Sequence, residues 1–101
     1  MYLKIHETSN GKIIAACDEN LMDRVLEDGK RILDLKKYRD FYNGKKVDKK
    51  EFQKVLADLS DSSSANLVGK EVIKIVLNMK LIDKNQIDYI AKTPFVQIYN
   101  I

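Results

Sequence analysis

Residues 2–17 read YLKIHETSNGKIIAAC and carry the strongest local folding signal of the chain. Two runs rich in β-forming residues flank the dipeptide Asn10-Gly11, which favours a tight hairpin turn because both central turn residues need positive φ. A two-residue turn at these positions places Ile5 opposite Ala16. One face of the hairpin is then apolar and is expected to be the core side; it carries Leu3, Ile5, Ile14 and Ala16.

Downstream of the hairpin, helical and β-type patterns alternate. Apolar residues at helical spacing predict helices over residues 21–27, 48–59, 65–79 and 83–91. The second of these begins at a capping box formed by Asp48 and Glu51. Runs of β-forming residues predict a middle strand over 32–35 and a C-terminal strand over 95–101. The Ser-rich segment 60–64 is interpreted as a loop that ends in a helix cap.

This order of elements predicts an α+β fold. We expect a small, mostly antiparallel sheet made of the N-terminal hairpin, the middle strand and the C-terminal strand, with three to four helices packed on it. The 101 residues match the length of one core, so residues 1–101 are expected to form a single domain. We expect a cytoplasmic protein without membrane contact, because the chain shows neither a secretory signal nor a run of about 20 apolar residues.

The sequence contains few groups suited to catalysis or metal binding. One Cys and one His exclude a disulfide framework and a four-ligand zinc site made by this chain alone. Cys17 and His6 form the one candidate nucleophile–base pair, and we interpret both as structural because no third group is evident to orient the imidazole. We therefore expect no catalytic residue, no metal and no cofactor, and the sequence favours a binding protein over an enzyme.

The net charge of +3 is unevenly distributed along the chain. Residues 30–54 contain ten basic and four acidic residues, so this segment carries +6 and the remainder −3. Basic side chains neutralise phosphates, and exposed aromatic rings stack on unpaired bases. The leading hypothesis is a non-enzymatic binding module that contacts RNA or a ribonucleoprotein, for example in translation. The alternative is a Lys-rich surface that is exposed to solvent and binds no partner. The predicted RNA-binding residues are Lys36, Lys37, Arg39, Tyr42, Lys45, Lys46, Lys49 and Lys50.

A second hypothesis places an anion site at the start of the third predicted helix, where free backbone N–H groups and the helix dipole attract negative charge. The residues of this site are Ser63, Ser64, Asn66, Gly69 and Lys70. Such a site would bind a phosphate-containing small molecule, either in a binding protein or in an enzyme. The simpler interpretation of the same residues is an ordinary helix N-cap that binds no ligand. A third hypothesis is an accessory subunit whose short exposed strands extend the sheet of a partner protein.

Several segments resemble a family of small archaeal proteins, domain of unknown function 424. They are the runs Tyr2 to Glu7, Ala16 to Asp18, Ala65 to Gly69 and Leu81 to Asp83, and the segment around Pro94. The resemblance spans nearly the whole chain, but Phe95 stands where the family pattern has a His after the Pro. It implies an archaeal cytosolic protein and supplies no mechanism, while it draws attention to Asn66, Gly69, His6 and Glu7.

Overall fold

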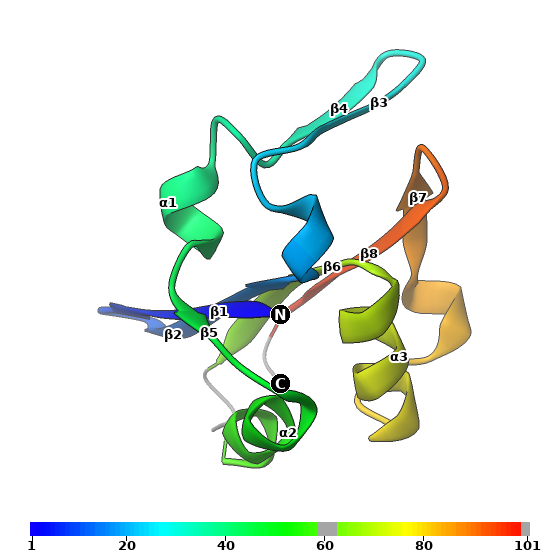
Figure 1. The fold of residues 1–101 in the computed structure, drawn as a ribbon. Helices are drawn as coiled ribbons and strands as arrows, with labels where there is room; N and C mark the ends of the chain where they lie inside the picture. Colours follow the sequence, from blue (N-terminus) through cyan, green and yellow to red (C-terminus); the bar gives the residue numbers. More distant parts are fainter. Residues whose placement is uncertain (59–62, 100–101) are drawn as a thin grey trace.

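The structure is a computed structural model that describes residues 1–58 and 63–99 (Figure 1). The elements in chain order are β1 (Tyr2–Thr8), β2 (Gly11–Cys17), η1 (Glu19–Leu21), β3 (Val25–Asp28), β4 (Arg31–Asp34), α1 (Arg39–Tyr42), β5 (Lys45–Lys46), α2 (Lys49–Ala57), β6 (Ser64–Val68), α3 (Lys70–Asn78), η2 (Lys84–Gln86), β7 (Asp88–Ile90) and β8 (Thr93–Ile98). The two η elements are single 3-10 turns.

The N-terminal hairpin forms, but its turn is Ser9-Asn10 rather than Asn10-Gly11. The Thr8 hydroxyl holds this turn, since it accepts a hydrogen bond from Asn10 N (3.2 Å) and donates one to Gly11 O (2.7 Å). Ile5 therefore faces Ile14, and the expected pairing with Ala16 is wrong. A register shift of two residues keeps every side chain on its face. The predicted shared face is thus confirmed for Leu3, Ile5, Ile14 and Ala16, but Ile5 is 43% exposed, so the expectation that it belongs to the core is wrong.

The main sheet has six strands in the order β5-β1-β2-β6-β8-β7. Strands β2 and β6 pair in parallel, whereas the other neighbours pair antiparallel. Strands β3 and β4 form a separate two-stranded sheet. The expected small, mostly antiparallel sheet of four strands is therefore wrong, because the sheet is larger and mixed. The prediction failed at residues 64–68, where a central strand stands in place of a loop and a helix start.

The described residues contain three α-helices, which pack on both faces of the larger mixed sheet and not on the small sheet that was expected. Helix α2 confirms the predicted cap, since the Asp48 Oδ1 atom accepts a hydrogen bond from Glu51 N at 2.8 Å. Helix α3 confirms the predicted apolar stripe from position 72 to 76. Of the predicted serine loop, residues 60–62 lie outside the described residues, Ser63 precedes β6 and Ser64 begins it.

Two predicted helices are instead strands preceded by a 3-10 turn. Residues 25–28 form β3, and Asp23 adopts φ 68°, which is incompatible with a continuing helix. The capping box of Asp83 and Gln86 forms, but it opens only the single turn η2 before β7 begins. Beyond β7, Ala91 (φ 48°) and Lys92 (φ 65°) form the tight turn into β8.

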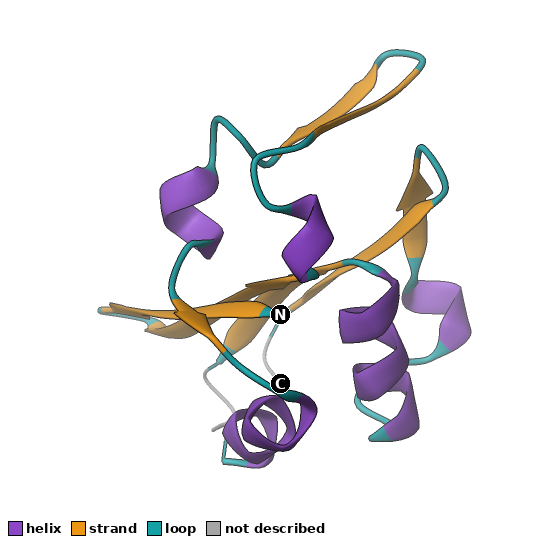
Figure 2. Ribbon diagram, viewed as in Figure 1, coloured by secondary structure: helices purple, strands orange, loops and turns teal. Residues whose placement is uncertain are grey.

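The main sheet separates two apolar cores, and Figure 2 shows helices on both sides of this sheet. Helices α2 and α3 cover one face, where Phe52 and Val76 pack against Ile14 and Leu67. Helix α1 and the chain around Leu35 cover the opposite face above β2. Both faces of β2 and β6 are thus covered, the environment in which parallel strands are normally found. Side chains that alternate along one central strand consequently reach two different sides of the molecule.

Candidate functional site

The basic segment wraps around the β5 edge of the main sheet instead of forming one face. Figure 1 shows α1 on one side of the sheet and α2 on the other, with β5 between them. Lys36, Lys37 and Arg39 are exposed near α1, whereas Lys49 and Lys50 are exposed at the start of α2. The eight residues predicted to bind RNA are therefore divided between two sides of the molecule.

Three of these basic side chains pair with carboxylates of the chain. Lys45 Nζ lies 2.5 Å from Glu51 Oε2, and Lys46 Nζ lies 2.6 Å from Glu19 Oε1. The hydrogen bond between Lys46 and Glu19 lowers the pKa of the Glu19 carboxyl and raises that of the Lys46 ammonium. Arg39 makes a longer ion pair with Asp23, at 3.4 Å. Lys36, Lys37, Lys49 and Lys50 form no ion pair with any residue that the structure describes.

Tyr42 is not positioned to stack on a base. Its side chain is only 6% exposed, and burial raises the pKa of its hydroxyl to about 12. The adjacent ring of Phe41 packs edge-on against it, with the ring centroids 5.1 Å apart. The exposed aromatic residue of this region is Tyr38, which is 54% exposed and which directly follows Lys37.

A groove of about 320 Å³ runs between α1 and the sheet. Two side-chain amides form part of its lining, because Asn66 of β6 is paired directly with Gln97 of β8 and the two residues share a sheet face. Its other lining residues come from β4 and the α1 region: Leu33, Asp34, Tyr38, Phe41 and Tyr42. The structure thus brings Asn66, predicted for the anion site, next to the predicted RNA-binding segment.

Contacts with β1 fix the α1 wall of this groove. The His6 ring stacks on Phe41, with a centroid distance of 4.6 Å and an interplanar angle of 12°. His6 Nε2 also lies 2.9 Å from the Phe41 carbonyl oxygen, and Lys4 Nζ donates to the Asp40 carbonyl at 2.6 Å. Helix α1 has only four residues and would be unstable alone, so these contacts hold it in place.

The groove offers the chemistry that recognises a planar, polar ring. An amide group presents both donors and an acceptor, so adjacent Asn and Gln side chains can match the edge of a base. The Asn66 amide makes no hydrogen bond with the described residues, while the Gln97 Oε1 atom accepts one from Tyr99 at 3.2 Å. The exposed Tyr38 ring adds a stacking surface, and the ammonium of Lys37 lies 5.5 Å from its centroid.

The predicted anion site has a different local structure from the one expected. Ser64 and Asn66 belong to β6, Ser63 is buried before it, and the helix begins only at Lys70. A carboxylate of the chain occupies the helix N-terminus, because the Asp18 oxygens accept hydrogen bonds from Glu71 N (3.0 Å) and Val72 N (2.9 Å).

Gly69 allows this close approach of Asp18 to α3. Its φ of +117° lies in the region that favours glycine, and a Cβ atom there would collide with the Asp18 carboxylate. Sequence reasoning missed Asp18. It follows β2 as Gly69 follows β6, and the carboxyl ends of two parallel strands lie at one edge. This signal required knowing that the two strands are parallel.

The Cys17 and His6 side chains do not form a catalytic pair. His6 is paired with Ile13 and Cys17 with Tyr2, so they lie at separate points along the hairpin. Burial of Cys17 raises the pKa of its thiol to about 12, which disfavours the reactive thiolate. Among residues 1–58 and 63–99, no group of three or more His, Cys, Asp or Glu side chains is placed to hold a metal ion. None of the described helices has the length and apolar character needed to span a membrane.

Fold and groove together define a small α+β protein with a mixed six-stranded sheet and an amide-lined groove beside α1. The family model described as "Protein of unknown function (DUF424)" matches residues 5–101. The chain therefore belongs to this family, which confirms the resemblance inferred from the sequence.

One solved structure is similar to the chain over nearly its full length. It is described as that of an "uncharacterized conserved protein from Methanopyrus kandleri". The two chains are 25% identical with a TM-score of 0.79, and the match covers 99% of this chain and 90% of that chain. No curated protein matches the sequence.

Proposed function

We propose that this protein binds single-stranded RNA at the groove between α1 and strands β6 and β8. The observation that carries the proposal is the pairing of Asn66 with Gln97 beside the exposed ring of Tyr38. An unpaired base would stack on Tyr38 and form hydrogen bonds with the two amides. A base held in a duplex has its edge paired and its faces stacked, so the groove selects single strands.

Lysines near Tyr38 provide the phosphate contacts in this proposal. Lys36 and Lys37 are exposed, make no ion pair with the described residues, and directly precede Tyr38. The proposal thus narrows the predicted surface to its α1 half. Lys45 and Lys46 are engaged by Glu51 and Glu19, and the α2 lysines lie across the sheet.

The experiment is a fluorescence-anisotropy titration of a short, labelled single-stranded RNA at several salt concentrations. Lys36→Gln with Lys37→Gln is expected to weaken binding and to reduce the salt slope by about 1.4, because each phosphate contact contributes about 0.7 on a single strand. The matched control is Lys49→Gln with Lys50→Gln, which removes the same charge from the opposite side of the sheet and should leave the slope unchanged. Equal losses in the two variants would contradict the proposed site.

The groove itself is tested by Tyr38→Ala and by Asn66→Ala with Gln97→Ala. Loss of one stacking contact costs about 1–3 kcal/mol, so Tyr38→Ala should weaken binding by about fivefold to 150-fold. A duplex of the same sequence serves as the competitor and should bind more weakly than the single strand. Absence of binding by the native protein at low salt, or a preference for the duplex, would overturn the proposed function.

A further inference from the structure

A second groove, also of about 320 Å³, lies between α3 and the β7–β8 hairpin. Its lining shares no residue with the groove beside α1. Aliphatic side chains, among them Leu77, Ile87 and Pro94, form much of its surface, and three exposed lysines line it: Lys70, Lys74 and Lys92. The combination of an apolar lining and concentrated positive charge is the observation from which the inference starts.

Helix α3 contributes one face to this groove. Residues 70, 73, 74 and 77 follow the i, i+3, i+4, i+7 spacing, so they form one stripe along the helix. The stripe holds two lysines and two aliphatic residues: Ile73 is buried in the core with Val72 and Val76, whereas Leu77 is half-buried and supplies apolar surface to the groove. The stripe therefore presents apolar surface and positive charge together to whatever occupies the groove.

The residues that the structure describes do not neutralise the three lysines. None of them forms an ion pair with a residue in the described ranges 1–58 and 63–99. The nearby Asp88 carboxylate is engaged by Arg31, with Nη2 2.9 Å from Oδ2. Lys92 occupies the second position of the tight turn at φ 65°, where Gly is normally preferred, so the hairpin holds a charged residue at an unfavourable backbone conformation.

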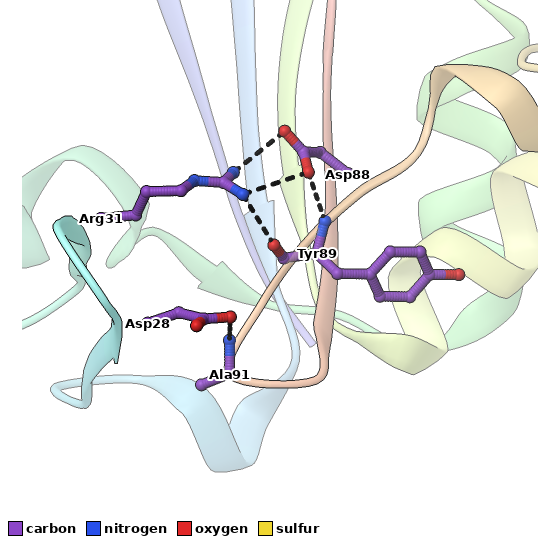
Figure 3. Close-up of polar contacts among 5 residues, drawn as sticks. All are labelled: Asp28, Arg31, Asp88, Tyr89 and Ala91. Atoms are coloured by element: carbon purple, nitrogen blue, oxygen red, sulfur yellow. Dashed lines mark hydrogen bonds and ion pairs between the residues drawn. The ribbon is translucent and has the colours of Figure 1, made fainter.

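The opposite side of the hairpin is anchored, which fixes the second wall of the groove. Arg31 bonds both to Asp88 and to the Tyr89 carbonyl oxygen (3.1 Å), and Asp28 accepts a hydrogen bond from Ala91 N at 3.3 Å. Figure 3 shows the Tyr89 ring extending away from Arg31. This ring is 56% exposed and lines the groove with the lysines.

We propose that the groove between α3 and the β7–β8 hairpin binds an acidic, amphipathic segment of a partner protein. Aliphatic and aromatic side chains of the segment fill the apolar lining, and its carboxylates face Lys70, Lys74 and Lys92. The aliphatic lining favours a peptide over RNA, because the edge of a base would meet no amide partners here. This surface is independent of the proposed RNA site.

The probe is a synthetic helical peptide about four turns long, with Leu at i, i+3, i+4 and i+7 spacing and Glu at the exposed positions. Binding is measured by calorimetry and located by NMR amide shifts. Lys70→Glu with Lys74→Glu is expected to weaken it by about tenfold or more, since both charges are reversed. The matched control is Lys50→Glu with Lys54→Glu, an exposed pair of equal spacing on α2. Circular dichroism checks that both variants fold.

The proposal is supported if the peptide shifts amides of α3 and β7 and only the α3 variant weakens binding. It is overturned if the native protein does not bind the peptide, or if both variants lose affinity equally. A companion peptide in which Ser replaces every Leu must bind more weakly; equal affinity would mean that charge alone acts. Displacement of the peptide by single-stranded RNA from the same amides would assign the groove to nucleic acid instead.

Discussion

Asp18 and Gly69 act together at the carboxyl ends of β2 and β6. The Asp18 carboxylate accepts hydrogen bonds from two backbone N–H groups of α3, and Gly69 leaves the space that this approach requires. Asp18→Ala is expected to lower the free energy of unfolding by about 2 kcal/mol, because the first turn of α3 loses its cap. Urea denaturation measures the change, with the exposed Asp58→Ala as the control.

A double-mutant cycle separates the two roles. Gly69→Ala alone should destabilise the protein through both the positive φ and the collision with Asp18. In the Asp18→Ala background the collision disappears and only the backbone strain remains, so the penalty of Gly69→Ala should shrink. If the two changes in the free energy of unfolding are simply additive, the Asp18 carboxylate is not the reason that position 69 requires glycine.

The buried thiol of Cys17 is expected to make the stability of the protein depend on pH in the alkaline range. Burial raises the pKa of its thiol from 9.0 to about 12, so the folded state keeps the proton that the unfolded chain releases. The unfolded state then binds fewer protons, and stability should fall as pH rises from about 9 toward about 12. Buried Tyr42, whose pKa is raised to about 12 from 10.0, acts in the same direction.

The measurement is urea unfolding at about pH 8 and about pH 10.5 for the native chain and Cys17→Ala. The variant should lose less stability between the two values, since one of the two groups is gone. An identical loss in both proteins would exclude a contribution from Cys17. Thiol labelling of the native chain should also be slow at the lower pH, because the thiol is fully buried.

At the scale of elements, the β3–β4 hairpin is tied to the body of the molecule through Arg31 (Figure 3). The guanidinium also lies 5.6 Å from the centroid of the Phe95 ring. Arg31→Ala should raise amide hydrogen exchange in β3 and β4, because the hairpin loses its main polar contacts. Global stability should change by less than about 1 kcal/mol, since the ion pair is exposed. Lys30→Ala is the control, and unchanged exchange would refute the tether.

Elements with a local start signal were predicted well. The Asp48 cap and the apolar stripe behind it correctly indicated α2, because capping and 3.6-residue spacing depend only on near neighbours. The helix predicted over residues 21–27 was wrong because its outcome depends on contacts with a more distant segment. Met22 and Leu26 fit the i, i+4 spacing of a helix, yet Asp23 in the left-handed region breaks the helix and the segment pairs with β4 instead.

At the scale of the whole molecule, the strand order of the main sheet, in which β6 lies parallel to β2 and antiparallel to β8, decides which residues meet. It brings Asp18 to the start of α3, although 53 residues separate Asp18 from Glu71 in the chain. It also places Asn66 beside Gln97 rather than in a helix cap. The charge-rich segment is divided across the sheet for the same topological reason, because β5 forms an edge between α1 and α2.

By itself, the sequence determined the shared apolar face of the hairpin, the capped start of α2, the family and the excess of positive charge in residues 30–54. These features rest on interactions between near neighbours or on composition. Only the tertiary structure decided the strand order, the groove of Tyr38, Asn66 and Gln97, and the carboxylate at α3. Each depends on contacts between distant segments, whose pairing is selected by burial on both faces of the central strands and leaves no local pattern.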